Sequence, residues 1–333
     1  MDSLRARGED PGPLAGVPFG VKDLEDCAGM PTSHGSLLFK GRPPVESDSI
    51  HVARLRAAGA IPLGKTAAPE FGTVAFTSTK AWGTTRNPWN TQRTPGGSSG
   101  GSAAAVSAGL VPFCTASDGG GSTRIPASFT GLFGLKPSFG RIPHPNGGAS
   151  QTSCFGALTT TVADAARHLD VASGSDDRDR TTLPAPGLSY EVAIEGLEVA
   201  GLRAAWSPDL GFAVVDPEVA AITAKAAMDL AHLAGLDLVD RPIVLSDPVR
   251  VWLSSGAPDL WIGLERGMFP ERAGELEPLT RAMLQLSEGV TVSQYAKIIE
   301  WRYRLEAEVA AAFDDVDVIL TPSTAVTAFA AEG

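Results

Sequence analysis

The sequence contains little cysteine, and its cysteines form no recognisable pattern. Among 333 residues there are three, Cys27, Cys114 and Cys154, which are widely spaced and include no C-x-x-C pair. An odd number at such spacings argues against a disulfide framework. We therefore expect reduced thiols that pack inside the protein, as in cytoplasmic proteins.

The sequence also lacks a long hydrophobic run and an excess of basic residues. Its N-terminus, MDSLRARGEDPGPLAG, has charges and prolines where a signal peptide needs an apolar stretch. No later run approaches the length of a membrane span. The 38 acidic and 27 basic side chains give a net charge of −11, which disfavours general binding to nucleic acid or anionic membranes. We expect a soluble cytoplasmic protein that binds neither directly.

Short apolar runs alternate with helical patterns along the chain, which is typical of an α/β fold with a covered sheet. Near the N-terminus, Asp48 or Ser49 can cap a short helix that stops at Gly59, and residues 60–63 then resemble a strand. The 43% of hydrophobic residues is sufficient for a sizeable core.

Two longer helices are predicted in the second half. One opens at Asp216 and Pro217 and ends at Gly235. The other begins near Thr291 and is followed by a strand over 316–320. The residues expected to be buried by this last helix are Ile298, Leu305, Val309 and Phe313.

Composition divides the chain unevenly. Residues 80–160 are rich in glycine, serine and threonine, whereas residues 185–315 are rich in alanine, leucine and glutamate. We expect the chemistry in the first part, with the second part serving as scaffold and substrate wall. Aromatic residues of the second part could line a pocket, but such residues more often belong to a core.

Two glycine-rich segments each join a loop to a helical pattern. The first, TPGGSSGGSAAAVSAG, covers residues 94–109, and the second, SDGGGSTRIPA, covers residues 117–127 and follows a strand-like run. Three glycines before Ser122 allow several N–H groups to point to one spot beside its hydroxyl, which would suit an oxyanion hole. Taken alone, each segment is more often a turn-rich connection, with Ser122 as a helix cap.

Two other pattern matches are set aside. Residues 59–66, GAIPLGKT, fit the phosphate-loop pattern, but they follow a helix and contain a strand, the reverse of the required order. Residues 96–101 contain G-x-S-x-G, yet they follow a polar segment where a nucleophile elbow needs a buried strand. The five histidines, His34, His51, His144, His168 and His232, show no metal-binding spacing, and we interpret them as solvated or packed residues.

Without a histidine base, a serine nucleophile needs another proton acceptor, and lysine is the usual alternative. Lys22 follows the alternating apolar residues Val17, Phe19 and Val21, so a strand would deliver its amine to the edge of a buried region. Burial favours the neutral amine, which can accept a proton near pH 7. The alternative is an ordinary lysine paired with neighbouring Asp23.

Three segments taken together favour the catalytic interpretation of Lys22 and Ser122 over the structural one. GVPFGVKDL with Lys22, PGGSSGGSAAA with Ser98, and SDGGGSTRIPASFTGLFGLKPS with Ser122 together resemble the amidase signature family in order and separation. GTTRNPWN, TTTVADAARHLD and DVILTPST match it as well. The resemblance implies the family's fold, a mixed central β-sheet covered by helices on both faces, and it runs along nearly the whole chain.

The resemblance also implies a mechanism. Ser122 would attack the amide carbonyl, Ser98, which follows a cis peptide bond in the family, would relay the proton, and Lys22 would accept it. The oxyanion hole would be formed around Gly119, Gly120, Gly121 and Ser122. Asp118 and Arg124 flank the nucleophile, and we expect them to orient its loop as a buried pair.

The implied activity is that of an amidase without metal or organic cofactor, acting on a small-molecule amide. A homodimer is left open. The nearest alternative is the glutamine-hydrolysing subunit of an aminoacyl-tRNA amidotransferase, which requires a partner protein. A third hypothesis is an inactive member of the family.

The sequence departs from the family's pattern at both ends. It begins at what resembles the tail of the first helical region, and only AVTAFAAEG follows DVILTPST. We expect one amidase-signature domain over 1–333, with the signature core over 12–182 and a more variable, truncated helical region over 185–333. Such a fold would be incomplete at both ends and would expose apolar surface.

Overall fold

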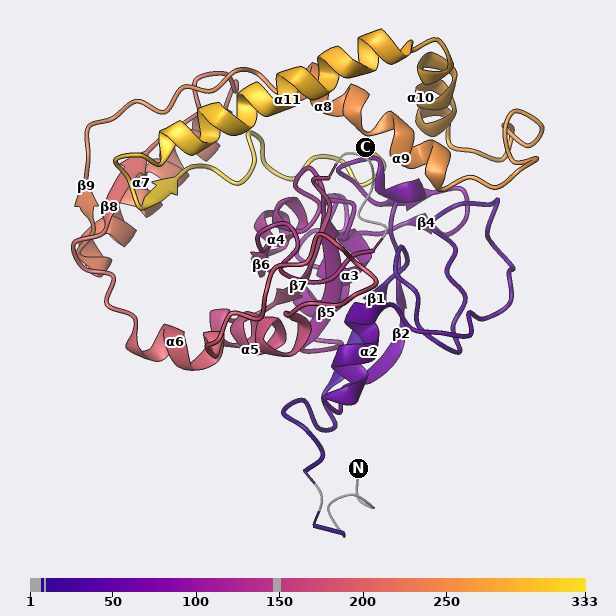
Figure 1. The fold of residues 1–333 in the computed structure, drawn as a ribbon, viewed down its shortest axis with the longest axis horizontal. Coiled ribbons are helices and arrows are strands. Elements are labelled where there is room, and N and C mark those ends of the chain that lie inside the picture. The colour runs from indigo at the N-terminus through magenta and orange to yellow at the C-terminus, as the bar shows by residue number, and fades with distance from the viewer. Residues whose placement is uncertain (1–6, 9, 146–150) are drawn as a thin grey trace. The chain divides into compact units, whose positions relative to one another are not determined.

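The computed structural model describes residues 7, 8, 10–145 and 151–333. These residues form two compact units (Figure 1). The first comprises the described residues of the ranges 1–195, 259–282 and 328–333, and the second comprises residues 196–258 and 283–327. Within the described part of the chain, no helix is both long and apolar enough to cross a membrane. A single domain over the whole chain stays a prediction.

A five-stranded sheet forms the centre of the first unit. Its strands, in spatial order, are β2 (Ile61–Thr66), β1 (Pro18–Lys22), β5 (Phe113–Asp118), β7 (Cys154–Thr159) and β6 (Phe133–Leu135). Strand β1 pairs in parallel with β2 and β5, whereas β7 pairs antiparallel with β5 and β6. The sheet is therefore mixed, as the amidase signature resemblance predicts.

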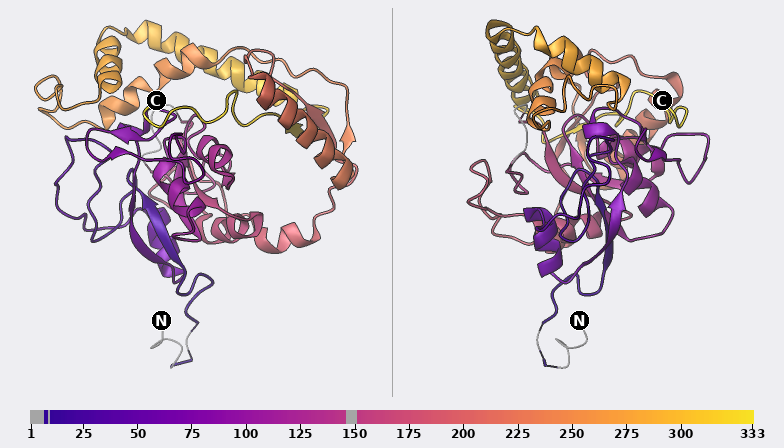
Figure 2. Two further views of the ribbon diagram at one scale, coloured as in Figure 1. Left: turned by 180° about the vertical axis from the view of Figure 1, so that it is seen from behind. Right: turned by 90° about the vertical axis from the view of Figure 1, so that its right-hand side faces the viewer.

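Helices pack against both faces of this sheet, because alternate residues of each strand point to opposite sides. Phe113 of β5 packs with Val52 and Leu55 of α2 (Ile50–Ala57), which in turn contacts α5 (Val162–Ala172). The helices on the other face are α3 (Gly100–Ser107) and α4 (Arg124–Thr130), where Ala103 and Ala127 meet Ala116 of β5. The layers can be followed in Figures 1 and 2.

The first predicted helix and strand are confirmed. Ser49 is the N-cap of α2, since its side chain accepts a hydrogen bond from the Val52 N–H. Gly59 follows with a φ of +92°, and β2 begins at Ile61. No helix follows the phosphate-loop pattern, because β2 leads into a single turn, η1 (Glu70–Gly72). A small antiparallel pair, β3 (Ser78–Thr79) with β4 (Gly83–Thr84), completes this region.

The second unit contains a small parallel sheet and long helices. The sheet has the order β10 (Val318–Leu320), β8 (Arg203–Trp206) and β9 (Asp237–Leu238). Its helices include α7 (Pro217–Ala234), α8 (Val249–Ser255) and α11 (Val292–Ala312). Helices α6 (Tyr190–Gly196), α9 (Ala257–Ile262) and α10 (Pro278–Glu288) include residues of both units.

The predicted helix boundaries are confirmed in this unit, but the predicted burial is wrong in part. Thr291 forms a capping box at the start of α11, and Gly235 ends α7 in the left-handed conformation. Val309 and Phe313 are 38% and 45% exposed, and among the described residues of α11 only Ala312 is buried. Helical spacing marks an apolar stripe, but burial depends on what packs against that stripe.

Candidate active site

The last residue of β1 is Lys22, and its side chain is buried. Phe19 and Val21, which alternate along the same strand, are fully buried as well, so the strand carries the lysine into the first unit as predicted. Burial lowers the pKa of Lys22 to about 7, although the carboxylates of Asp118 and Glu25 oppose the shift. At neutral pH, Lys22 is therefore the free amine in a large fraction of the protein molecules.

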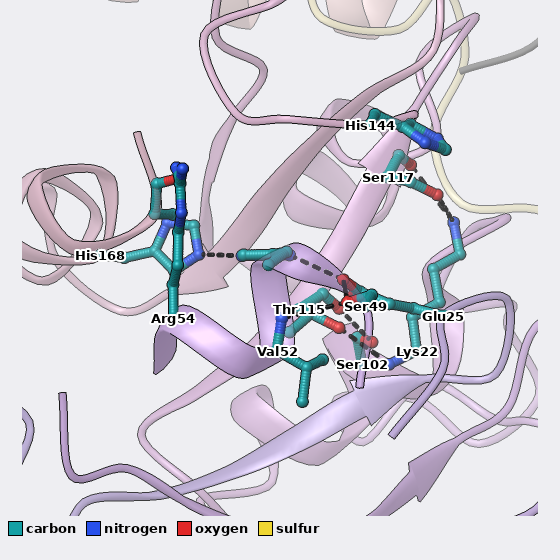
Figure 3. Close-up of polar contacts among 12 residues, drawn as sticks. Lys22, Glu25, Ser49, Val52, Arg54, Ser102, Thr115, Ser117, His144 and His168 are labelled. Atoms are coloured by element: carbon teal, nitrogen blue, oxygen red, sulfur yellow. Dashed lines mark hydrogen bonds and ion pairs between the residues drawn. The ribbon is translucent and has the colours of Figure 1, made fainter. Parts of the chain in front are cut away.

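The amine of Lys22 contacts two serines. Its Nζ atom lies 2.8 Å from Ser98 Oγ. It also lies 2.9 Å from Ser117 Oγ and 3.2 Å from the Ser117 carbonyl oxygen (Figure 3). A neutral amine has two N–H groups and one lone pair. It can donate to the Ser117 carbonyl and to one hydroxyl while it accepts a proton from the other, so this arrangement suits a proton acceptor for Ser98.

Ser98 is held in a tight backbone turn before α3. The peptide bond from Gly97 to Ser98 is cis, as the resemblance implies, and the Ser98 side chain is buried. A Cβ atom on Gly97 would lie 2.6 Å from the Phe76 nitrogen, and one on Gly72 would lie 3.1 Å from Ser98 Oγ. Glycines at these two positions thus let the backbone approach closely enough to place the Ser98 hydroxyl beside Lys22.

The carboxylate of Asp118 organises the loop that carries Ser122. It accepts hydrogen bonds from the N–H groups of Gly121, Thr123 and Arg124, and two more from the Arg124 guanidinium at 2.8 and 2.9 Å. Burial would raise the pKa of Asp118, but the hydrogen bonds and charge of Arg124 outweigh it and hold the pKa below its usual range. The expected ion pair is present, but it is only half buried, because Arg124 reaches toward solvent and is 48% exposed.

The structure brings the segments of Ser98 and Ser122 together. The Ser99 N–H donates a hydrogen bond to the Ser122 carbonyl oxygen at 3.1 Å, so the residue after Ser98 contacts the backbone of the nucleophile candidate. Ser122 is partly exposed, whereas Ser98 and Lys22 are buried. The Lys22–Ser98 pair is therefore shielded from water, whereas Ser122 is accessible in part.

Gly121, the last of the three glycines before Ser122, is held by Asp118. The Gly121 N–H already donates to Asp118 Oδ1 at 2.6 Å. Its φ of +118° is a conformation that glycine adopts without strain. Gly121 therefore shapes the loop that carries Ser122.

Sequence reasoning missed Ser117. This residue lies at the end of β5, directly before Asp118, and supplies two of the three polar contacts of the Lys22 amine. The available signal was its position at the carboxyl end of a buried strand that leads into the glycine triplet.

The three cysteines are buried and free, which confirms their predicted packing role. Among the described residues, no group of three or more histidine, cysteine or acidic side chains could hold a metal ion.

Comparison with known proteins gives a consistent picture. A family model described as Amidase matches residues 1–332. The chain is 39% identical to a subunit of the glutamyl-tRNA(Gln) amidotransferase from Synechococcus sp. (strain WH7803), over 99% of this chain and 72% of that protein. It is 40% identical to the putative amidase AmiA2 of Mycobacterium bovis, over 97% of this chain and 66% of that protein.

Solved structures give the same result. A bacterial aryl acylamidase of the amidase signature enzymes superposes with a TM-score of 0.89 and 27% identity, covering 99% of this chain and 70% of that one. The 6-aminohexanoate cyclic dimer hydrolase, solved with its substrate, gives a TM-score of 0.84 and 33% identity, covering 92% and 66%. The chain thus spans between 66% and 72% of the length of these relatives.

Proposed function

Because the chain belongs to the amidase signature family, we propose that it hydrolyses the C–N bond of a carboxamide through an acyl-enzyme on Ser122. The observation that carries the proposal is the 2.8 Å hydrogen bond between Lys22 Nζ and Ser98 Oγ, with both side chains buried. A buried amine with a pKa of about 7 is a competent base at neutral pH.

The proposed reaction begins with attack of Ser122 Oγ on the amide carbon. The proton of Ser122 passes to Ser98 Oγ while the proton of Ser98 passes to Lys22 Nζ. Lys22 thereby gains a positive charge, and no charge remains on either serine. The resulting oxyanion accepts hydrogen bonds from the loop amides. Lys22 then returns its proton through Ser98 to the leaving nitrogen, and the C–N bond breaks to release ammonia or an amine.

Water completes the cycle. It attacks the ester on Ser122, and its proton follows the same route to Lys22, after which the ester C–O bond breaks and Ser122 recovers its proton. The products are a carboxylic acid and the free enzyme. Asp118 and Arg124 keep the Ser122 loop in place throughout this sequence, as positioning residues that touch no reacting atom.

The experiment that tests this function uses intact-protein mass spectrometry. The protein is incubated with a serine-directed fluorophosphonate, and separately with a panel of aliphatic and aryl carboxamides. We expect one covalent adduct, on Ser122, together with acid and amine products from at least one amide. Absence of any adduct would favour the inactive alternative.

A second candidate function is favoured by the names of several relatives. The chain is 39% identical to a protein named as a subunit of glutamyl-tRNA(Gln) amidotransferase. In that case the same serine would hydrolyse glutamine, and the ammonia would pass to a partner protein that acts on aminoacylated tRNA. Ammonia release from free glutamine, compared with release from simple amides, separates the two functions.

A further inference from the structure

Residues 328–332, in the first unit, lie beside the loop that leads to Ser98. They are joined to residues 92–94 by an antiparallel bridge and by two backbone hydrogen bonds, of 2.9 and 3.1 Å. The Thr94 N–H is one of the donors, and the Phe329 carbonyl oxygen accepts this hydrogen bond. The mechanism proposed above assigns no role to the 328–332 segment.

The Phe329 side chain packs against two other aromatic rings. Its centroid lies 6.3 Å from that of Phe76, with 78° between the ring planes, and 6.0 Å from that of Phe129, with 89° between the planes. Both arrangements are edge to face, which aromatic pairs favour. All three residues are half-buried. One side chain thus links a segment that precedes Ser98 with a helix that follows Ser122.

The contact with Phe76 reaches the turn that places Ser98. A Cβ atom on Gly97 would lie 2.6 Å from the Phe76 nitrogen and 2.7 Å from the Phe76 carbonyl oxygen. The next residue, Thr77, donates its hydroxyl proton to the Gly96 carbonyl oxygen at 2.9 Å. A shift of Phe76 therefore displaces the two glycines directly before Ser98.

The contact with Phe129 reaches the helix that follows Ser122. Phe129 lies on α4, which begins two residues after Ser122. Pro126 of the same helix packs against the turn before Ser98, since a Cβ atom on Gly96 would lie 2.8 Å from Pro126 Cα. The turn and α4 are thus in direct contact, and the Phe329 ring packs on residues that support each of them.

A buried asparagine supports the same arrangement. Asn87 is 3% exposed, and its Nδ2 atom donates hydrogen bonds to the Phe129 carbonyl oxygen at 2.8 Å and to the Thr94 carbonyl oxygen at 3.3 Å. It thereby joins α4 to the loop that also pairs with the 328–332 segment. Because the amide and the aromatic ring hold the same two segments, removal of the ring should loosen these segments while the amide still connects them.

We propose that Phe329 is a positioning residue that holds the Ser98 turn and the Ser122 loop at the separation needed for proton transfer between the two hydroxyls. The proposal rests on the proposed function. Proton transfer requires short, well-aligned contacts, and a displacement of about 1 Å can slow a reaction about a hundredfold. The ring contacts of Phe329 involve neither Lys22 nor its strand, so the protonation of Lys22 should not depend on them.

F329A tests this role because it removes the ring and keeps the backbone hydrogen bonds. The rate of fluorophosphonate labelling of Ser122 at pH 8 should fall about tenfold. The acid limb of the pH profile should stay at the wild-type pH, because the lysine is untouched. F329L keeps part of the apolar contact and should be labelled at a rate between those of the wild type and F329A.

L14A is the matched control for stability. Leu14 is buried in a core cluster beside α2 that contains no residue of either serine loop, and its truncation opens a cavity there. L14A should lower the Tm at least as far as F329A does and should keep the wild-type labelling rate.

Three outcomes would overturn the inference. They are labelling of F329A at the wild-type rate, an equal loss of rate in L14A, and an acid limb that moves in F329A. If F329A fails to fold, the comparison of F329L with L14A decides in the same way.

A further measurement does not depend on catalysis. Hydrogen–deuterium exchange, read by mass spectrometry, follows peptides that cover residues 94–101 and 117–127. We expect faster exchange in both peptides of F329A than in those of the wild type, and wild-type exchange there in L14A. Unchanged exchange in F329A would contradict the inference. If wild-type Ser122 is not labelled at all, the proposed function fails, whereas the exchange rates still decide whether Phe329 holds the two loops.

Discussion

The five-stranded sheet of the first unit and the three-stranded sheet of the second differ in depth of burial more than in type of pairing. Both contain parallel strands, but every residue of β7 is buried, whereas β9 is exposed along its length. The helices differ in the same way, since the 11 residues of α5 include five buried ones and the 18 residues of α7 include two. All three candidate catalytic residues belong to the first unit.

Depth of burial determines where a proton relay can be built. A proton relay needs side chains held within a few tenths of an ångström, and packed strands hold them better than lightly buried helices do. Lys22 ends a buried strand, and the loop of Ser122 follows another. Matched substitutions in the two units should therefore have unequal effects on activity and stability.

The largest contrast is expected between two serines. S122A should reduce fluorophosphonate labelling and amide hydrolysis at least about a thousandfold, because it removes the proposed nucleophile. S293A, on an exposed position of α11, should leave both unchanged. Intact-protein mass spectrometry measures both variants. Full labelling of S122A would assign the nucleophile elsewhere.

A smaller but still large contrast is expected between two lysines. K22M keeps the length of the side chain and removes the amine, so labelling and hydrolysis should fall about a hundredfold to ten-thousandfold. Thermal unfolding should show a folded protein, since methionine fits a buried position. K297M is the control, because Lys297 on α11 is 80% exposed. Equal activity of both variants would remove lysine from the mechanism.

Leucine-to-alanine changes compare the two units in stability. L158A opens a cavity in a fully buried position of β7 and should lower the free energy of unfolding by about 3 kcal/mol. L233A, at a position of α7 that is 83% exposed, should change it by less than about 0.5 kcal/mol. Urea denaturation measures both. A similar loss of free energy of unfolding in both variants would contradict the exposure of Leu233 in this structure.

The smallest contrast concerns two ion pairs. D118N removes the carboxylate that binds Arg124 and the loop amides, and should cost about 2 kcal/mol, less than a fully buried pair because Arg124 is half exposed. D317N breaks the exposed pair with Arg203 in the second unit and should leave the Tm nearly unchanged. Calorimetry compares them. A D118N protein with full stability and activity would contradict the role given to this loop.

The sequence predicts most of what depends on local signals. The caps at Ser49, Asp216 and Thr291 lie where the residue types place them, because a cap needs only its own turn. The motifs around Lys22, Ser98 and Ser122 likewise identify a mixed sheet and the candidate catalytic residues. The cis bond before Ser98 is also as the resemblance implies.

What the sequence misses depends on contacts between distant segments. His51 and His168 are 117 positions apart, and only the packing of α2 against α5 brings their rings together. Ser117 approaches Lys22 because β5 pairs with β1, which no local pattern reveals. The burial predicted for Phe313 is wrong for a related reason, since an apolar stripe predicts a face but not its neighbours.

The role of Lys22 as proton acceptor is tested by the pH dependence of Ser122 labelling by a fluorophosphonate in the wild-type protein. Lys22 accepts a proton only when it is neutral, and its burial lowers its pKa to about 7. Below that pH the labelling rate should fall about tenfold per unit, and above it the rate should be level. A rate that is constant from pH 5 to 9, or that keeps rising toward the ordinary range of lysine, would contradict the account.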